Sequence, residues 1–393
     1  MNSFADELNR RLVSLREQNL FRELRRVDSP QGVRIQFGGR SFLNFSSNDY
    51  LGLASHPVLK AAAIDAVSKY GAGSGASRLV CGSLAPFHDL EEALAAFKKT
   101  GAALVFSSGY AAAVGAITAL LGKDDIVILD KLVHASIVDA ARLSGARLRI
   151  FGHNDLDDLE AKLQWAGRAK TENCRPKGEI LVVTESIFSM DGDAAPLREI
   201  VALKEKYGAW LMVDEAHATG IFGQNGSGLA DELGVSHQIE VKMGTLGKAV
   251  GAGGGFICGS RALVDLLTNR ARSFIFSTAP APAAAAAALA GIRLIQTRDG
   301  ENLRTRLRHR IAGLKSALHA PRSAMEGAII PLILGGEGRA VAAAAKLREQ
   351  DVFVPAIRYP AVARGAARLR ITLTAAHAES DVAELVRALK TLD

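Results

Sequence analysis

The 393-residue sequence has only three cysteines, Cys81, Cys174 and Cys258, which lie far apart and form no C-x-x-C pair. Such a set excludes a disulfide framework and the paired thiolates of a zinc knuckle. The sequence also lacks long blocks of like charge, although its formal net charge is +7. Nucleic-acid binding therefore has no support, whereas a mild positive surface could favour an acidic partner, either a nucleotide-bearing thioester or an acidic carrier protein.

Sequence features of membrane and secreted proteins are missing as well. The most membrane-like run, Ala279 to Ile292, contains two prolines and is shorter than the roughly 20 residues that span a bilayer. The start of the chain mixes acids and arginines, so it is not a signal peptide. Its apolar residues Phe4, Leu8, Leu12 and Leu15 recur at helical spacing and predict an amphipathic helix. We expect a cytosolic protein without membrane contact.

Motifs of several common enzyme classes are absent. Ala249 follows Lys248, so the glycine-rich stretch there is not a phosphate-binding loop, which requires Ser or Thr after the lysine. No G-x-S-x-G occurs, which disfavours a serine hydrolase, and no H-E-x-x-H occurs, so we expect no metal ion. The run Gly71 to Ala76 matches a dinucleotide fingerprint nominally, but it follows a predicted helix where that fingerprint follows a strand, so we interpret the match as false.

The composition, 48% hydrophobic and 23% charged, is that of an ordinary globular protein, and the length suggests two or three domains. Strand-length apolar runs occur at 103–106, 126–129, 147–151, 180–184 and 210–213. They alternate with helical patterns near 87–98, 110–121, 135–143, 155–166 and 197–207. This alternation predicts an α/β fold with a mostly parallel sheet and helices on both faces.

Both ends of the chain depart from this alternation. Residues 1–45 predict a helix, a polar turn and a short hairpin with Gly38-Gly39 at its bend. After an alanine-rich helix, the pattern predicts helix 300–318, strand 327–334, helix 338–350, strand 352–357, strand 368–373 and helix 378–391. We therefore predict an N-terminal segment (1–45), a large α/β domain (46–285) and a small C-terminal α+β domain (286–393).

Two predicted strands are followed by charged residues that suit one cofactor. Asp214 directly follows strand 210–213, at the edge where parallel sheets bind ligands. Lys248 follows the next strand, within glycines that let the backbone approach a ligand closely. An acid at this edge often binds magnesium, and a lone lysine is usually a surface ammonium. Together, however, they match pyridoxal phosphate, which requires a Schiff-base lysine and an acid beside its ring nitrogen.

Other polar residues could complete such a site. The turn at Gly109 and Tyr110, between a strand and a small-residue helix, either binds an anion with its free amides or is an ordinary β–α turn. His134 either stacks on a planar cofactor or caps a helix, and His217 could bond the cofactor's phenolic oxygen. Near the C-terminus, bidentate arginines suit a carboxylate substrate. The candidates there are Arg358, Arg368 and Arg370, and the last two share one face of a strand, so the pattern does not choose between them.

These residues, in this order, resemble the α-oxoamine synthases, pyridoxal-phosphate enzymes of fold type I with the aspartate-aminotransferase fold. The resemblance runs nearly from end to end. It is carried by NFSSNDYLGL (44–53), GSGASRLV (73–80), FSMDGD (188–193) and RLRITLTAAH (368–377), which most resemble the family branch that serves biotin synthesis.

The resemblance implies a role for each matching residue. Lys248 would hold the cofactor covalently and move the α-proton, Asp214 would keep the pyridinium protonated, and His134 would stack on the ring. Further cofactor contacts would come from Gly109, Tyr110, Ser189, His217 and Thr245, and from Thr278 of the neighbouring subunit in an obligate homodimer. The substrates would be bound by Asn48 and Arg370 at the amino-acid carboxylate, and by Arg22, facing the distal acid of the acyl chain, and Arg358. Glu185 would border the same pocket, and Cys81 would be small, buried and without chemistry.

The implied activity is that of an acyltransferase. It would condense L-alanine with a pimeloyl thioester to give 8-amino-7-oxononanoate and carbon dioxide. Coenzyme A and acyl carrier protein both remain open as the acyl carrier. The alternative is a sister synthase that uses glycine or L-serine. From other classes, a nucleotide-binding ATPase is disfavoured by the missing phosphate loop, and a non-catalytic subunit by the presence of Lys248.

Overall fold

The computed structural model describes residues 3–172, 178–319 and 327–392. These residues form two compact units, which are described separately. The large unit comprises residues 49–189 and 193–305, and the terminal unit comprises the described residues of 1–48, 190–192 and 306–393. The division into domains at residues 45 and 285 stays a prediction.

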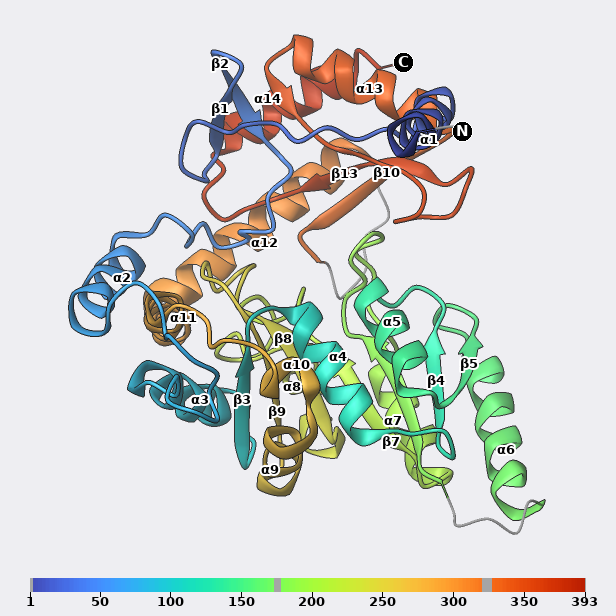
Figure 1. Ribbon diagram of the computed structural model, residues 1–393. Helices are drawn as coiled ribbons and strands as arrows, with labels where there is room; N and C mark the ends of the chain where they lie inside the picture. The colour runs from blue at the N-terminus through green and yellow to red at the C-terminus, as the bar shows by residue number, and fades with distance from the viewer. Residues whose placement is uncertain (1–2, 173–177, 320–326, 393) are drawn as a thin grey trace. The chain divides into compact units, whose positions relative to one another are not determined.

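A seven-stranded sheet forms the centre of the large unit, with strand order β3-β9-β8-β7-β6-β4-β5 (Figure 1). The strands are β3 (Ala102–Phe106), β4 (Ile126–Asp130), β5 (Arg147–Phe151), β6 (Ile180–Glu185), β7 (Trp210–Asp214), β8 (Val241–Thr245) and β9 (Gly255–Gly259). Only β9 is antiparallel to its neighbours, β3 and β8. The predicted α/β fold with a mostly parallel sheet is confirmed, including all five predicted strands.

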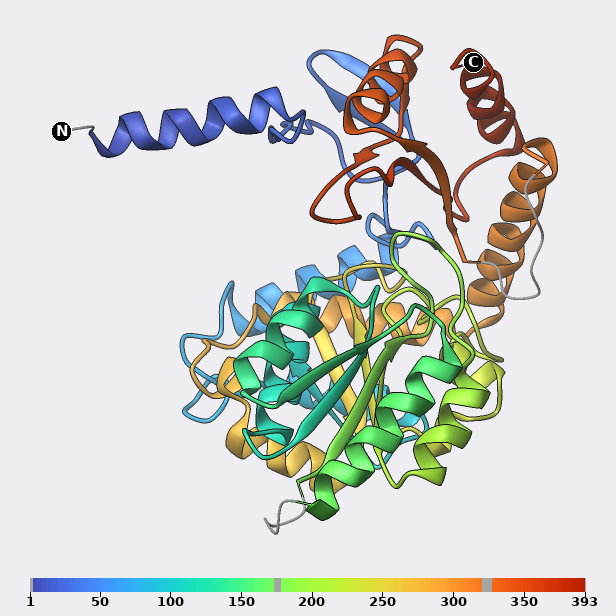
Figure 2. The same cartoon turned by 90° about the vertical axis from the view of Figure 1, so that its right-hand side faces the viewer.

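Helices cover both faces of this sheet (Figure 2). They are α2 (Pro57–Tyr70), α3 (Ala85–Phe97), α4 (Gly109–Leu120), α5 (Ala135–Ser144), α6 (Leu156–Glu172), α7 (Leu197–Lys206), α8 (Leu229–Glu232), η1 (Ser236–Gln238), α9 (Arg261–Arg270), α10 (Arg272–Ile275) and α11 (Pro282–Ile295); α12 (Arg298–Ala317) continues into the terminal unit. Helix α4 lies close to the sheet because its buried side chains are small. Ala112, Ala113 and Ala116 are fully buried there, in one apolar core with the strands. That core fixes where the strand ends lie.

The terminal unit contains two three-stranded sheets, β1-β2-β11 and β10-β13-β12. Its elements are α1 (Phe4–Glu17), β1 (Arg34–Phe37), β2 (Arg40–Asn44), β10 (Ile329–Gly335), α13 (Glu337–Glu349), β11 (Val352–Phe353), β12 (Ala356–Ile357), β13 (Ala367–Thr372) and α14 (Glu379–Leu389). The predicted hairpin is confirmed, and Gly38 and Gly39 have φ of +58° and +75°, which a two-residue hairpin turn needs. The predicted strand 352–357 is wrong. It divides into β11 and β12, which belong to different sheets, because Pro355 between them has no N–H to donate to a ladder.

Helix α1 has the predicted amphipathic pattern, and it is exposed on all sides. Ser3 and Asp6 form a capping box at its start. Its apolar side chains gain little from burial, since Phe4 is 81% exposed and Leu8 is 40% exposed.

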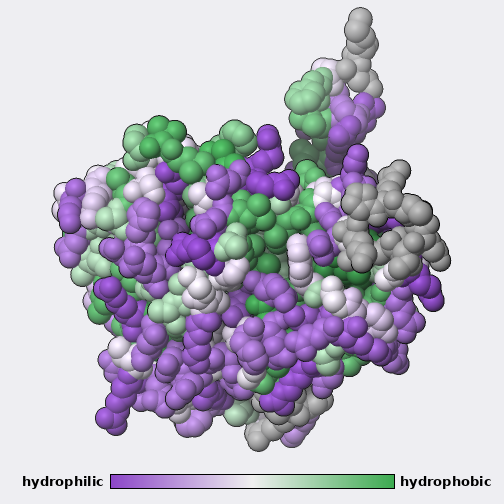
Figure 3. Space-filling model, turned by 90° about the horizontal axis from the view of Figure 1, so that it is seen from below, coloured by the Kyte–Doolittle hydropathy of each residue, from purple (hydrophilic) through white to green (hydrophobic). Residues whose placement is uncertain are grey.

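Within the described parts of the chain, no helix is long and apolar enough to cross a membrane. Hydrophilic side chains predominate on the face shown in Figure 3.

The two described cysteines have opposite surroundings. Cys258 is buried in β9, and this burial raises the pKa of its thiol to about 12, which makes it unreactive. Cys81 is exposed, so the expectation that it is buried is wrong. It follows Leu79 and Val80 in a turn, and these two residues are exposed as well. Cys174 lies outside the described residues.

Candidate active site

The predicted acid and lysine lie at one edge of the large unit's sheet. Asp214 is the last residue of β7, and Lys248 lies in the turn between β8 and β9. In the parallel register, Asp214 is level with Glu185 of β6 on one side and Met243 of β8 on the other. This is the carboxyl edge of the parallel strands, where α/β sheets bind ligands.

Lys248, His217 and Tyr50 form a line of hydrogen bonds at this edge. Lys248 Nζ lies 2.8 Å from His217 Nε2, and His217 Nδ1 lies 2.5 Å from the Tyr50 hydroxyl. A neutral imidazole has one N–H, so one ring nitrogen donates while the other accepts. The line can therefore pass a proton between the amine and the phenol. Our sequence reasoning missed Tyr50, although it lies inside the motif at 44–53.

Two buried carboxyl groups, Glu185 and Asp214, lie beside this line. Burial, together with the neighbouring Asp214, raises the pKa of Glu185 well above its usual range. Burial also raises the pKa of Asp214, although the positive charge of Lys248 lowers it in part. Asp214 Oδ1 accepts the backbone N–H of Ala216 at 2.8 Å. Glu185 Oε1 is buried without a hydrogen-bond partner in the described structure. Loss of solvent disfavours the charged form of a buried carboxyl group. A cationic hydrogen-bond donor beside it, such as a pyridinium, would stabilise that charged form.

His134 and Ser189 lie near these acids. The backbone N–H groups of both residues hydrogen-bond the carboxyl group of Glu185. These bonds lower its pKa and partly offset the rise caused by burial. His134 caps α5, since its Nδ1 accepts the N–H of Ser136 at 3.3 Å and lies 2.8 Å from the Ser136 hydroxyl. Loss of solvent around the ring lowers the pKa of His134. The negative charge of Asp214 raises this pKa, and the positive charge of Lys248 lowers it. The capping alternative therefore describes the structure, and stacking on a cofactor stays a prediction.

The candidate phosphate turn lies where β3 passes into α4. Gly109 begins α4, whose N-cap Ser108 accepts the N–H of Ala111 at 3.0 Å. The Thr245 hydroxyl donates to the Gly254 carbonyl at 3.0 Å and accepts the N–H of Gly247 at 3.2 Å. A β-carbon on Gly109 would lie 3.7 Å from that of Thr245, so the two are adjacent. Free amides at a helix start beside a hydroxyl suit a phosphate.

Tyr110, the next residue in this turn, points elsewhere. Its side chain is 49% exposed, and its hydroxyl donates to Asp139 at 2.9 Å. Asp139 raises the pKa of Tyr110. Any phosphate contact of Tyr110 would therefore come from its backbone amide.

We expect Gly255→Ala to disrupt this phosphate turn. A β-carbon at Gly255 would lie 2.4 Å from the Ser108 carbonyl oxygen and 2.5 Å from the Gly109 nitrogen, so the turn backbone would have to move. Binding of pyridoxal phosphate should weaken by roughly 10- to 100-fold, as expected for the loss of one hydrogen bond to a charged group. Titration of the purified protein with the cofactor measures this. Gly253→Ala is the matched control, because no atom of the described residues lies within 4 Å of its added β-carbon. Equal affinities of the two variants would contradict the assignment of the turn.

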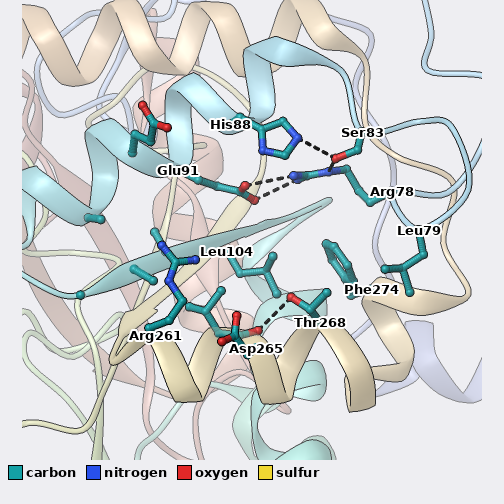
Figure 4. Close-up of a pocket in the computed structure, with 16 residues that line it drawn as sticks. Arg78, Leu79, Ser83, His88, Glu91, Leu104, Arg261, Asp265, Thr268 and Phe274 are labelled. Carbon is teal, nitrogen blue, oxygen red and sulfur yellow. Dashed lines mark hydrogen bonds and ion pairs between the residues drawn. The ribbon is translucent and has the colours of Figure 1, made fainter.

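Thr278 is exposed and forms an isolated antiparallel bridge with Ser77. The loop around Ser77 is held by Arg78, whose guanidinium donates to both oxygens of Glu91 at 2.9 and 3.0 Å and to the Ser83 hydroxyl at 2.9 Å (Figure 4). Glu91 in turn accepts the N–H of Val105 in β3 at 2.9 Å. This network attaches the Thr278 bridge to the central sheet, and a role of Thr278 in a neighbouring subunit stays a prediction.

A buried ion pair supports the turn that follows Asp214. Lys98 Nζ lies 2.9 Å from Glu215 Oε2 and donates to the Thr219 hydroxyl at 2.8 Å and to the Ser227 carbonyl. Both charged side chains are 2% exposed. The pair holds the turn that carries His217, and sequence reasoning missed it because Lys98 and Glu215 are 117 residues apart.

We expect Lys98→Met to destabilise the protein by about 3–5 kcal/mol, because it leaves the Glu215 carboxylate buried without its cation. Urea unfolding measures the loss. The neighbouring exposed pair of Lys99 with Asp231, in which the lysine is 63% exposed, provides the control, and Lys99→Met should cost less than about 1 kcal/mol. Similar losses for the two variants would show that the buried pair has no special part in stability.

The predicted substrate residues form two groups in the terminal unit. Arg370 donates to Asn48 Oδ1 at 3.0 Å and to the Thr372 hydroxyl at 3.1 Å, both neutral acceptors. Arg368 lies 2.5 Å from the Asp191 carboxylate, which neutralises it. The ion pair with Asp191 already gives Arg368 a carboxylate partner within the protein, which disfavours Arg368 for a substrate carboxylate.

The second group is Arg22 and Arg358, which line one pocket of about 380 Å³. Arg22 donates to the Tyr359 carbonyl at 2.8 Å, and Arg358 donates to the Phe21 carbonyl at 3.3 Å. Burial, with the charges of Arg22 and Arg25, lowers the pKa of Arg358. The terminal unit therefore brings together Arg22, predicted to face the distal acid of the acyl chain, and Arg358, predicted to bind a substrate.

Comparison with known proteins identifies the family to which this chain belongs. The family Aminotransferase class I and II matches residues 40–389. The 8-amino-7-oxononanoate synthase of Geobacter sulfurreducens (strain ATCC 51573 / DSM 12127 / PCA) is 48% identical over 96% of this chain and 95% of its own. Among solved structures, a serine palmitoyltransferase variant from S. paucimobilis with a bound PLP-myriocin aldimine has a TM-score of 0.90 at 29% identity, covering 98% of this chain and 96% of its own. An 8-amino-7-oxononanoate synthase from Francisella tularensis has a TM-score of 0.74 at 27% identity, covering 89% and 97%. The chain therefore belongs to the class I and II aminotransferase family, with the fold of the type I PLP enzymes, and within it to the 8-amino-7-oxononanoate synthases.

Proposed function

We propose that this chain condenses L-alanine with a pimeloyl thioester, releasing carbon dioxide and the free thiol and forming 8-amino-7-oxononanoate. The observation that carries the proposal is the contact of Lys248 with His217 beside Asp214, in a chain 48% identical to a synthase of this name. The required cofactor is pyridoxal 5′-phosphate, which supplies an electron sink for the charge left when the α-proton of alanine is removed.

The residues at the sheet edge fit this cofactor. Lys248 would hold it covalently, and Asp214 would accept the hydrogen of its pyridinium nitrogen. Gly109, Tyr110 and Thr245 would bind its phosphate. His217 and Ser189 would contact its phenolic oxygen, and His134 would stack on its ring. The buried, unpartnered oxygen of Glu185 supports a further hydrogen donor at this place.

The chain's own groups also manage the protons of the reaction. The free amine of Lys248 would take the α-proton of the substrate and later return a proton to the product. His217 and Tyr50 lie in hydrogen-bond contact behind it and can hold that proton, so it need not pass to bulk water. Asp214 would place a negative charge against the ring nitrogen of the cofactor, which would support the electron sink that the cofactor supplies.

Substrate recognition would use the arginines of the terminal unit. Asn48 and Arg370 would bind the carboxylate of alanine, and Arg22 and Arg358 would bind the acyl substrate. Coenzyme A and acyl carrier protein both fit the net charge of +7 as acyl carriers. Thr278 would contact the cofactor phosphate of a neighbouring subunit, so the working protein would be a homodimer with shared active sites.

Purified protein with pyridoxal phosphate, L-alanine and pimeloyl-coenzyme A should yield 8-amino-7-oxononanoate, detected by mass spectrometry, and equimolar carbon dioxide. Parallel reactions with glycine and L-serine test the alternative of a sister synthase. A higher kcat/KM with either of these amino acids would reject alanine as the substrate. Lack of condensation with all three, in protein that binds the cofactor, would reject the proposed reaction.

A further inference from the structure

A histidine that the mechanism does not use lies between two carboxylates in the large unit. His153, just after β5, has its Nδ1 3.0 Å from Asp130 Oδ1 and its Nε2 2.8 Å from Asp193 Oδ2. Its ring also stands edge-on to Phe188, with centroids 4.3 Å apart and planes at 89°. We call His153, Asp130 and Asp193 the His153 clamp.

The geometry makes the ring of His153 an imidazolium. A carboxylate oxygen only accepts hydrogen bonds, so a ring nitrogen facing one must carry a hydrogen. Both ring nitrogens face carboxylates here, and both must therefore donate. Although burial opposes the charge, these two hydrogen bonds raise the pKa of His153 to about 10. The clamp is thus a charged bridge at neutral pH.

The contact of His153 with Asp130, one arm of the clamp, holds the turn before α5. Asp130, at the end of β4, is fully buried at its side chain, and its Oδ1 accepts the N–H of Leu132 at 2.8 Å. Its Oδ2 accepts the N–H of Asn154 at 2.9 Å. The turn fastened in this way leads directly to His134.

The contact of His153 with Asp193, the other arm of the clamp, holds the loop after β6. The Asp193 backbone carbonyl accepts the N–H of Phe188 at 2.9 Å, which closes the loop that contains Ser189. Asn154 Nδ2 donates to Asp193 Oδ2 at 3.1 Å and to the Ala194 carbonyl at 3.2 Å. The clamp therefore joins two chain segments that would each contact the cofactor.

We propose that His153 is a positioning residue of the active site, whose imidazolium holds the His134 turn and the Ser189 loop in the arrangement that binds pyridoxal phosphate. The role rests on the proposed function, because the two segments matter to catalysis only if His134 and Ser189 contact the cofactor. His153 itself acts through these residues.

The first test asks whether the clamp joins the two segments, and it needs no cofactor. In His153→Gln the side-chain amide donates to one carboxylate but presents its oxygen to the other, so one arm must open. Hydrogen–deuterium exchange of the apo protein should then accelerate in both 130–136 and 186–194, with α9 unchanged. His237→Gln, an exposed histidine before β8, is the control. Unchanged exchange in both segments would overturn the clamp.

The second test asks whether the clamp serves the cofactor. His153→Gln should weaken pyridoxal-phosphate binding and lower kcat, each by roughly 10- to 100-fold, and should change the ratio of the cofactor's absorbance bands. Asp193→Asn should act in the same direction, and provides a second variant if the first does not fold. The double variant should recover part of the affinity, because Gln and Asn can hydrogen-bond each other. Faster exchange with unchanged affinity and spectrum would mean that His153 supports the fold only, and would overturn the proposal. Failure of the wild type itself to bind pyridoxal phosphate would instead reject the proposed function.

The charge of the clamp also predicts a pH dependence of stability. The charged groups facing His153 are Asp130, from β4, and Asp193, from the loop after β6. Because the pKa of His153 is raised from 6.5 to about 10 on folding, its stabilisation is complete below pH 6.5 and is lost as pH rises toward about 10. The stability difference between wild type and His153→Gln in urea unfolding should shrink over this interval. A difference that does not change with pH would reject the imidazolium.

Discussion

Lys248→Ala is expected to lower the rate of condensation by about 10,000-fold or more, because it removes both the covalent attachment of the cofactor and the base for the α-proton. The variant should remain folded, since the turn around residue 248 is held by backbone hydrogen bonds such as that of Gly251 N–H to the Lys248 carbonyl, 2.9 Å. It should still bind pyridoxal phosphate, but without a covalent bond. Borohydride reduction followed by mass spectrometry measures this directly, since only the wild type should retain the added mass.

Lys131→Ala provides the control for this experiment. Lys131 is exposed and lies in the large unit, three residues before His134. Its replacement should leave the retained mass and the rate of condensation unchanged. If Lys248→Ala keeps the added mass after reduction, another lysine holds the cofactor, and the position of Lys248 near His217 has a different purpose.

Asp214→Asn should slow removal of the α-proton of alanine by roughly 100- to 1,000-fold, the range expected when one preorganised electrostatic contact is lost. The amide has nearly the shape of the carboxylate and can still accept the N–H of Ala216, which Asp214 accepts at 2.8 Å. It has no charge, however, to keep the ring nitrogen of the cofactor protonated. The covalent attachment through Lys248 should persist, so binding and chemistry can be separated.

The measurement is the loss of deuterium from alanine labelled at its α-carbon, followed by nuclear magnetic resonance without the thioester. Asp89→Asn, on the exposed side of α3, is the control and should exchange at the wild-type rate. An undiminished rate in Asp214→Asn would contradict the role of Asp214 at the ring nitrogen. Loss of cofactor from the variant would show that Asp214 serves binding.

The order of strands and helices, and the places of Asp214 and Lys248, follow from the sequence by itself. Both are local: apolar periodicity specifies which residues are buried, and a residue directly after a buried strand must lie at the edge of the sheet. The same reasoning failed at 352–357, where two short strands separated by Pro355 have the composition of one. It also failed at Cys81, because no local pattern reports whether another element covers a turn.

The partners of the polar residues were decided only by the tertiary structure. Tyr50 is 167 residues from His217, and Arg368 is 177 residues from Asp191. The carboxylate that pairs with Arg368 is distant in the sequence, and the charge of His153 depends on one carboxylate from β4 and one from the loop after β6. A hydrogen bond requires atoms within about 3 Å, and for groups so far apart in the chain, only the folded backbone brings them to that distance.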